Sequence, residues 1–342
     1  IFKERLTVLF GPQHGLMTDL QENMIETEHN IHPHFKIPVY SLYSETRKPT
    51  PEMLKNIDTL IIDLQDIGTR IYTYIYTLYY CMEAAVENKK KIIILDRPNP
   101  LGGNKVEGPM LEKEYASFVG LFPLPLVHGL TMGEMALYIK AHFFPHINLE
   151  IVKATNWKRH MLWEETLLPW TPPSPNIPTP MGCLTFPLTV LYEGTNLSEA
   201  RGTTRPLEMV GAPQIEPFSF VQHLNNKYKN EFEGIILRPT YFRPTHHKFK
   251  DETCGGVHIH ITDWNKCNSW LAGVLLLKEF HDVLGKAFSW REPPYEYEYT
   301  KLPIDIINGS DAIRVAIEKG ISLDTIKSLD GSDFKTQRKE FL

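Results

Sequence analysis

Residues 59–96 read TLIIDLQDIGTRIYTYIYTLYYCMEAAVENKKKIIILD, and this segment carries the clearest structural signal in the chain. It opens with a short continuous apolar run at 59–64 and closes with another at 91–96, each of strand length. Between them, 72–91 places apolar residues at helical spacing. Two buried strands joined by a helix predict a parallel β-α-β unit.

The same alternation continues on both sides of this segment. Apolar runs at 6–10 and 149–154 predict two more strands, and 131–143 predicts a helix. Thr131 and Glu134 stand three residues apart at its start, as in a capping box. Continuous apolar strands separated by helices are typical of a parallel sheet covered on both faces, as in a Rossmann-like domain. We expect one further strand before residue 1.

The composition and pattern of the sequence change after residue 157. A proline-rich segment at 168–180 predicts extended chain, and the apolar run at 183–191 is interpreted as a buried strand. Further elements are predicted in the order helix, strand, strand, helix at 218–228, 234–244, 255–263 and 269–285. The chain is therefore predicted to be α/β, with a Rossmann-like, mostly parallel domain at 1–212 and a smaller α+β domain at 213–342.

Composition excludes several classes of protein. The 342 residues are 42% hydrophobic and carry a net charge of -5, which gives no electrostatic footprint for nucleic acid. No apolar run reaches the ~20 residues of a membrane span. The four cysteines are scattered, so neither a disulfide framework nor a zinc ribbon is indicated. Phosphate-binding glycine motifs are also absent, and we predict no cofactor.

A metal site is the alternative that the histidines raise. His258 and His260 stand two apart on a predicted strand, where both side chains could face one side near Cys254 or His246. Paired histidines are also common on the wet face of a strand, and no carboxylate stands at a diagnostic spacing. We predict no bound metal.

Polar clusters follow the predicted strands and indicate a ligand site. Because parallel strands end at one edge of a sheet, ligands bind in the crevice beyond that edge. The clusters are GPQHG at 11–15, QDIGTR at 65–70, RPNPLGGNKVEGP at 97–109 and YEGTNLSEARGTTRP at 192–206. The last holds two carboxylates and two guanidinium groups. The alternative interpretation of each cluster is a solvated loop.

The acids in these clusters suit glycoside hydrolysis, in which two carboxylates act across a cleft. Singly, each acid could instead be a cap, a turn former or a surface charge. The arginines suit a ligand with a carboxylate or phosphate, or they pair with neighbouring glutamates to fix the loop. These arginines are Arg97, Arg201 and Arg205.

Long motifs in order resemble one family. They are FGPQHG, PVYSLYSETRKPTPEML, DLQDIGTRIYTYIYTL, LDRPNPLGG, VEGPML, SFVGLFPLPLVHGLTMGE, PPSPNIPTP and EGTNLSEARGTTRPLEMVGAP. Together they resemble the exo-β-N-acetylmuramidase family of bacterial peptidoglycan hydrolases, long catalogued as a domain of unknown function. The resemblance spans nearly the whole chain and is densest between 8 and 213.

The resemblance implies a site in the cleft between the two domains and release of N-acetylmuramic acid from the non-reducing end of peptidoglycan fragments. The lactyl carboxylate of that sugar gives the arginines a natural partner. The resemblance implies no metal and no nucleotide. It favours a periplasmic or secreted location and leaves the cytoplasm open, and the oligomeric state is not indicated.

One departure from the family pattern concerns the reaction itself. Family members usually read GPEHG where this chain has Gln13, and that glutamate is the favoured catalytic acid. Glutamine can hydrogen-bond a glycosidic oxygen but cannot protonate it. Three interpretations follow: another acid acts, with Asp19, Glu22 and Glu26 nearby; the activity is weakened or altered; or the chain is a muropeptide-binding protein without hydrolysis.

The resulting site prediction has two parts. The catalytic candidates are Glu193, Glu107, Glu22 and Asp66. The predicted substrate-binding residues are Gln13, His14, Asp63, Asn176, Asn196, Glu199, Arg201 and Arg205. Among these, His14 and Asn196 would orient hydroxyl or acetamido groups, and Arg201 or Arg205 would bind the lactyl carboxylate.

Overall fold

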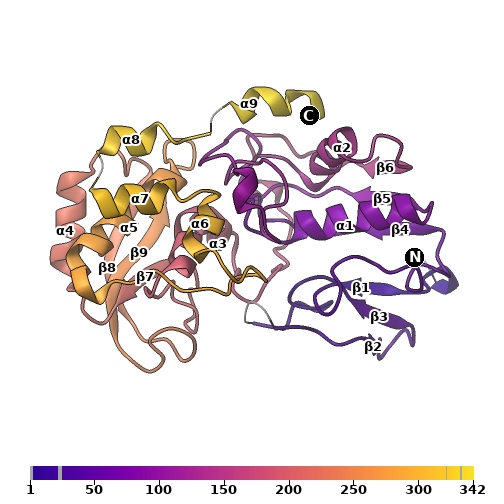
Figure 1. Cartoon of the computed structure of the whole chain (residues 1–342), viewed down its shortest axis with the longest axis horizontal. Helices are drawn as coiled ribbons and strands as arrows, with labels where there is room; N and C mark the ends of the chain where they lie inside the picture. Colours follow the sequence, from indigo (N-terminus) through magenta and orange to yellow (C-terminus); the bar gives the residue numbers. More distant parts are fainter. Residues whose placement is uncertain (1–2, 22–24, 321, 332) are drawn as a thin grey trace.

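The computed structural model of the chain describes residues 3–21, 25–320, 322–331 and 333–342. Two lobes lie side by side, an N-terminal one with β1–β6, α1 and α2 and a second one with β7–β9 and α4–α8 (Figure 1). The mixed α/β class predicted from the sequence is confirmed. None of the described helices is long and apolar enough to cross a bilayer.

The segment 59–96 forms the predicted parallel unit. A three-stranded parallel sheet has the order β4-β5-β6, made of β4 (Thr59–Ile62), β5 (Lys91–Leu95) and β6 (Leu149–Val152). The crossover helices are α1 (Tyr74–Glu87) and α2 (Met132–His142). They bury Leu60, Ile62, Ile92 and Ile94 in one apolar cluster with their own side chains. This cluster is the core of the N-terminal lobe.

The sheet is covered less evenly than predicted. Burial alternates along β4, and Ile61 on the face opposite the core keeps 37% of its surface exposed. The prediction that the sheet is covered on both faces was therefore wrong at this strand. A continuous apolar run shows that both faces of a strand are apolar. It does not show whether another element packs on each face.

The first predicted strand belongs to a different sheet. β1 (Leu9–Gly11) pairs in parallel with β3 (Pro38–Ser41), and β3 pairs antiparallel with β2 (Asn30–Ile31). No ladder joins β1 to β4 among the described residues. The expected single edge with all clusters side by side is therefore replaced by two separate sheets.

The second lobe contains an antiparallel sheet of order β7-β9-β8, made of β7 (Met209–Ala212), β8 (Ile235–Phe242) and β9 (Cys254–Ile261). α4 (Pro217–Lys227) packs on this sheet, and α5 (Ser269–Leu284) is buried along most of its length. The predicted helices and strands of this half are confirmed. Because β7 pairs with β9, the last strand before residue 213 lies in the second lobe; the domain division at 212 stays a prediction.

The apolar run at 183–191 was predicted as a buried strand, and this was wrong. Residues Pro180–Thr189 form helix α3, followed by a 3₁₀ turn at Val190–Gly194. Length and polarity do not separate a buried strand from a buried helix. The start signal was present, since the Thr179 side chain accepts a hydrogen bond from the Gly182 amide and Pro180 is the first helical residue.

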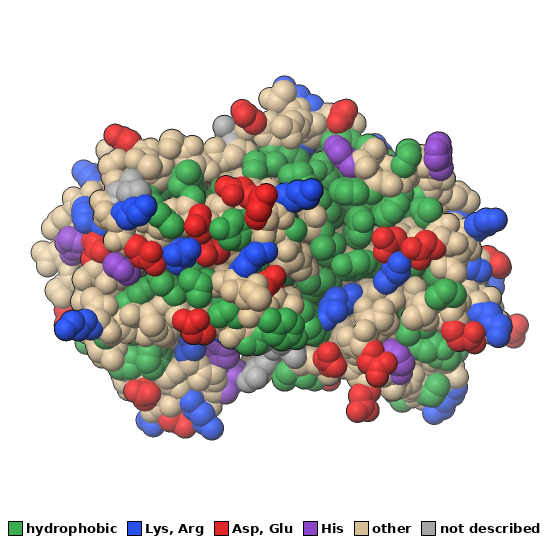
Figure 2. Space-filling model, in the orientation of Figure 1, with side chains coloured by type: hydrophobic (Ala, Val, Ile, Leu, Met, Phe, Trp, Pro, Cys, Tyr) green, Lys and Arg blue, Asp and Glu red, His purple; other side chains and the backbone are tan. Residues whose placement is uncertain are grey.

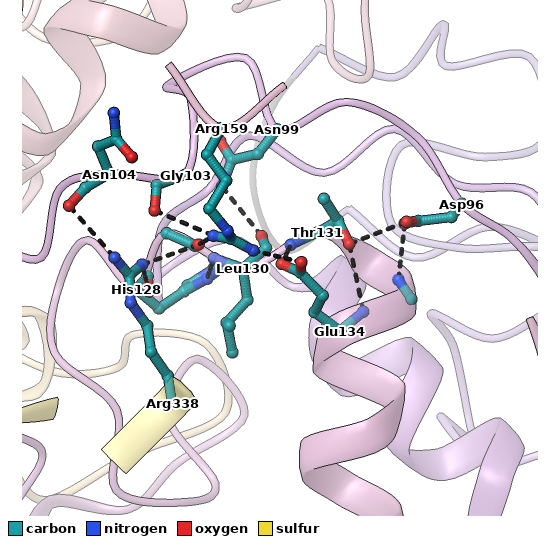
Figure 3. Close-up of polar contacts among 12 residues, drawn as sticks. Asp96, Asn99, Gly103, Asn104, His128, Leu130, Thr131, Glu134, Arg159 and Arg338 are labelled. Atoms are coloured by element: carbon teal, nitrogen blue, oxygen red, sulfur yellow. Dashed lines mark hydrogen bonds and ion pairs between the residues drawn. The ribbon is translucent and has the colours of Figure 1, made fainter. Parts of the chain in front are cut away.

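The C-terminal residues return to the N-terminal lobe after three short helices, α6 (Pro303–Asn308), α7 (Ala312–Lys319) and α8 (Leu323–Lys327). α9 (Phe334–Gln337) then lies above α2 (Figure 1). Arg338 donates from Nη1 to the carbonyls of His128 and Gly129, both at 2.8 Å (Figure 3). Phe334 and Phe341 join the core of the N-terminal lobe. This return had no sequence signal.

The N-terminus of α2 confirms the predicted capping box (Figure 3). Thr131 Oγ1 accepts from the Glu134 amide at 3.2 Å, and Glu134 Oε2 accepts from the Thr131 amide at 2.9 Å. Asp96, directly after β5, accepts from Thr131 Oγ1 at 3.0 Å and from the Gly133 amide at 2.7 Å. This carboxylate therefore stabilises a helix start.

Candidate active site

A pocket lies where segments from both lobes meet. Its empty space, including the part that is open to solvent, is about 380 Å³. Its polar lining comes from four separate parts of the chain and includes Gln13, His14, Asn176, Glu193, Arg201 and Glu296. Ile71, Tyr72, Ile177, Phe186, Val190 and Leu207 supply its apolar wall. On the face in Figure 2, apolar side chains gather along the junction of the lobes.

The turn after β1 places Gln13 and His14 in this pocket. The Gly15 amide bonds to the Pro12 carbonyl at 3.0 Å, and both His14 and Gly15 have left-handed backbones, with φ of 70° and 81°. Glycine at position 15 adopts this conformation without the strain that a side chain would add. The tight turn aims two consecutive polar side chains into the space beyond the strand.

His14 is held as a neutral base. Its Nδ1 lies 2.7 Å from the Leu20 carbonyl, which can only accept, so Nδ1 carries the proton. Burial lowers the pKa of His14 to about 4 despite this hydrogen bond. At neutral pH the other ring nitrogen, Nε2, is therefore an acceptor, suited to a hydroxyl or amide proton.

Glu193 and Arg201 form the charged wall of the pocket. Glu193 lies in the 3₁₀ turn after α3 and accepts from Arg201 Nη2 at 2.5 Å and from the Tyr295 hydroxyl at 2.8 Å. Arg201 Nε lies 3.2 Å from Glu199. Burial alone would lower the pKa of Arg201, but the charges of Glu193 and Glu199 outweigh it and raise the pKa.

Arg201 has one more donor. Within the described part of the chain, its Nη1 is buried and has no hydrogen-bond partner. Asn176, on the proline-rich segment, donates to the Gln21 carbonyl at 2.5 Å, while its Oδ1 is likewise buried without a described partner. Buried polar groups are normally paired, so an unmet donor and acceptor in one pocket indicate a ligand with the opposite groups.

Glu199 lies one layer behind the pocket. It is fully buried and contacts Lys248 at 2.8 Å and His247 at 3.4 Å as well as Arg201. Although burial would raise it, the charges of Lys248, His247 and Arg201 lower the pKa of Glu199 to about 2. Glu199 therefore positions Arg201 and is not among the residues that line the pocket.

A shallow groove adjoins the pocket through the same loop. It is lined by Gly202, Arg205, Arg243, His246 and His258, with no carboxylate among its lining residues. Arg205 pairs with Glu208 at 3.3 Å and has a half-exposed side chain. The predicted site residue Arg205 thus lies beside the pocket. No group of three or more metal-ligating side chains is found among the described residues, these histidines included.

Three other predicted site residues have structural contacts instead. Glu107 accepts from the Ser269 amide at 2.9 Å and pairs with Lys105 at 2.6 Å, so it caps α5. Asp66 accepts from the Gly68 amide at 2.7 Å, and burial raises its pKa to about 7. Asp63 pairs with Arg97 at 2.6 Å near the surface. None of the three is among the residues lining the pocket.

Two predicted residues remain. Asn196 bridges to the Ala287 carbonyl at 2.8 Å and to the Ser289 amide at 3.1 Å, which joins its loop to the segment after α5. Glu22 lies outside the described residues. The structure therefore brings Gln13, His14, Asn176, Glu193 and Arg201 together in one pocket, and the roles of the predicted residues stay predictions.

Sequence reasoning missed one carboxylate in the pocket. Glu296, in the segment PPYEYEY at 293–299, accepts from Gln13 Nε2 at 3.2 Å and from the Tyr43 hydroxyl at 2.8 Å. Only 3% of its surface is exposed. Its segment follows no predicted strand end, and only the unusual density of aromatic and acidic residues marked it.

The matches to known proteins cover nearly the whole length of the chain. Residues 2–181 match a family model described as exo-β-N-acetylmuramidase NamZ, N-terminal, and residues 184–342 match its C-terminal counterpart. The peptidoglycan β-N-acetylmuramidase NamZ of Bacillus subtilis (strain 168) is 44% identical over 344 residues, which covers 99% of this chain and 80% of that protein.

Two solved structures of DUF1343 family proteins from Bacteroides fragilis NCTC 9343 share the fold. One has a TM-score of 0.86 at 34% identity and covers 98% of this chain and 86% of its own. The other has a TM-score of 0.74 at 29% identity, with 98% and 85% covered. With both of its halves matched and a relative of 44% identity, this chain belongs to the exo-β-N-acetylmuramidase NamZ family.

Proposed function

We propose that this protein is an exo-acting glycosidase that releases N-acetylmuramic acid from the non-reducing end of peptidoglycan fragments. Membership of the family and the activity named for the B. subtilis relative support both the reaction and the substrate class. The observation in this chain that carries the proposal is the pairing of Glu193 with Arg201 in a pocket where Arg201 Nη1 has no partner among the described residues.

The pocket groups match the substituents of the sugar. The lactyl carboxylate of N-acetylmuramic acid accepts from Arg201 Nη1 and completes the hydrogen bonds of the guanidinium group. Asn176 Oδ1 accepts the acetamido N–H, and His14 Nε2 accepts a ring hydroxyl. N-acetylglucosamine has no lactyl carboxylate and leaves Arg201 Nη1 unpaired, which gives the site a basis for selectivity.

Glu193 is the carboxylate placed at the anomeric carbon in this proposal. Its hydrogen bonds from Arg201 and Tyr295 fix its orientation. There it stabilises the oxocarbenium-like charge that develops at C1 as the glycosidic bond breaks, either as a base toward water or as a nucleophile. The remaining saccharide lies in the adjoining groove lined by Arg205 and Arg243.

A chromogenic assay tests this function. We expect the protein to hydrolyse 4-nitrophenyl β-N-acetylmuramide and to leave the matching N-acetylglucosaminide nearly untouched. Glu193→Gln should lower kcat by at least about 100-fold while binding of N-acetylmuramic acid, measured by calorimetry, persists. Glu233→Gln, which alters an exposed pair with Lys266, is the matched control. Sugar binding without turnover in the unaltered protein would contradict hydrolysis and favour a muropeptide-binding protein.

A further inference from the structure

We propose that Glu296 is the proton donor of this glycosidase, the acid that Gln13 cannot be. The inference rests on the proposed function and assigns a residue that the sequence motifs did not identify. Its basis is the position of Glu296 in the pocket, its buried contacts and the backbone that holds it.

Glu296 and its neighbour Tyr297 adopt a backbone conformation that is unusual for glutamate and tyrosine. Tyr295 and Glu298 exchange two backbone hydrogen bonds of 2.9 Å, which closes a tight turn with Glu296 and Tyr297 at its centre. Both central residues have left-handed backbones, with φ of 44° and 67°. Turns of this kind strongly favour Asn-Gly, because each larger side chain costs about 1–2 kcal/mol in this conformation. Here the strained turn places a carboxylate in the pocket.

Contacts from the opposite lobe fix the carboxylate. Gln13 Nε2 donates to Oε1 and Tyr43 donates to Oε2. The Gln13 side chain is itself oriented, because its Oε1 accepts from Thr73 Oγ1 at 2.7 Å. Gln13 therefore acts as a positioning residue, and Glu296 reaches the pocket beside the position where an acid at residue 13 would be.

The surroundings favour the protonated form of Glu296. Burial raises the pKa of Glu296 to about 7, and the negative charge of Glu193 adds to this shift. The hydrogen bonds from Tyr43 and Gln13 and the charge of Arg47 oppose it. An acid with a pKa near 7 is about half protonated at neutral pH, so it can donate its proton during the reaction.

The two pocket carboxylates thus have different environments. Glu193 accepts from a guanidinium group and a phenol, while Glu296 accepts from an amide and a phenol. When two carboxyl groups in one site have different environments, one can act as the acid and the other as the base or nucleophile. Asp66 also has a raised pKa, but it is not among the residues lining the pocket. The geometry therefore selects Glu296.

The step balances with water as the only other reactant. The Glu296 proton moves to the glycosidic oxygen as the C1–O bond breaks, and the shortened saccharide leaves as an alcohol. Water supplies the hydroxyl group at C1. Its second proton goes to Glu193 if that carboxylate is the base, or to the ionised Glu296 if Glu193 is the nucleophile. The anomer first released distinguishes these two cases.

Leaving-group dependence tests the assignment. A poor leaving group such as a sugar needs protonation, and an activated one such as 2,4-dinitrophenolate does not. We expect Glu296→Gln to lower kcat on an N-acetylmuramyl disaccharide by about 10²–10⁴-fold and on the dinitrophenyl β-muramide by less than tenfold. Glu193→Gln should impair both substrates strongly. Glu298→Gln, in the same turn but hydrogen-bonded to Thr300, is the matched control.

A pH profile gives a second, independent measurement that does not need the Glu296 variant to fold. The kcat/KM of the unaltered protein on the disaccharide should fall above about pH 7. Tyr43→Phe removes a hydrogen bond that lowers the pKa of Glu296, so this basic limb should move to higher pH. Equal losses on both substrates in Glu296→Gln, or a basic limb that does not move in Tyr43→Phe, would overturn the assignment. Failure of the unaltered protein to cleave any muramide would instead overturn the proposed function.

Discussion

Arg201 joins structure and selectivity in a single side chain. Two of its nitrogens hold Glu193 and Glu199, and the third, Nη1, is buried without a described partner. Lysine would keep the charge but has no planar fork to hold a carboxylate while it donates in another direction. The geometry of this guanidinium group, more than its charge, is what the pocket uses.

Arg201→Lys should therefore weaken binding of N-acetylmuramic acid by about 10–100-fold, since one hydrogen bond to a charged group contributes ~1.5–3 kcal/mol. Binding of N-acetylglucosamine, which lacks the lactyl carboxylate, should change much less. Calorimetry with both sugars measures the difference, and Arg205→Lys in the adjoining groove should have a smaller effect. An equal loss for both sugars would mean that Arg201 acts only by holding Glu193.

At this scale, sequence reasoning found the residues that stand in dense polar clusters. Gln13, His14, Glu193 and Arg201 were predicted together, and they line one pocket. Glu296 was missed because its contact with Gln13 spans 283 residues. The sequence contains no local pattern for a contact between distant segments, and the left-handed turn that produces it is made of residues that do not favour one.

The start of helix α2 shows how far a local motif determines an element. Thr131→Ala removes the cap to the Glu134 amide and the bond to Asp96, so the free energy of unfolding should fall by about 1–2 kcal/mol. Thr131→Ser keeps both hydrogen bonds and should lose much less. Urea unfolding measures this. Because the cap is not among the pocket-lining residues, kcat should stay the same, and a reduced kcat would show that the helix start orients the site.

The contrast between α2 and α3 explains which elements were predictable. α2 has an apolar periodicity and a capping box, and both were recognised. α3 is buried on nearly every side, so it has no polar face to reveal a helical period. Pro187 inside it further disfavoured a helix. Its burial against α5 and β9 outweighs these local preferences.

The two lobes are joined by buried charged groups as well as by apolar contacts. Arg70 precedes α1 and donates to four carbonyls, those of Pro109 and Leu124 in its own lobe and of Ile307 and Asn308 in α6. Burial lowers its pKa to about 10, so it stays charged at neutral pH. Because the pocket lies between the lobes, this contact also fixes the relative position of its walls.

Arg70→Met should lower the free energy of unfolding by more than about 3 kcal/mol, because it removes a buried donor from four carbonyls, of which that of Leu124 still accepts from the Leu111 amide at 3.1 Å. The comparison variant is Lys48→Met, which removes an exposed pair with Glu87 and should cost at most about 1 kcal/mol. Denaturant titration measures both. Similar losses in the two variants would mean that the lobes are held by apolar packing alone.

The stability of the whole molecule should depend on pH through opposing buried groups. The pKa of His14 is about 4 in the folded protein and 6.5 as its ordinary value, so between these pH values only the unfolded chain holds its proton. Folding is therefore weakened by His14 as pH falls. Glu296 and Asp66, whose pKa values burial raises to about 7, act in the opposite direction, because the folded protein keeps protons that the unfolded chain releases.

Removing one of these groups should reveal its own contribution to the pH dependence of the free energy of unfolding. His14→Asn suits the left-handed backbone at φ 70° and cannot titrate, so it deletes the His14 contribution with little backbone cost. Relative to the unaltered protein, its free energy of unfolding should rise by ~1.4 kcal/mol for each pH unit lowered from 6.5 toward 4. Urea unfolding at pH 4.5, 5.5 and 6.5 measures this slope. A difference between the two proteins that is constant across the three pH values would mean that His14 is protonated to the same extent when folded and unfolded, and that Nε2 is a donor in the pocket at acidic pH.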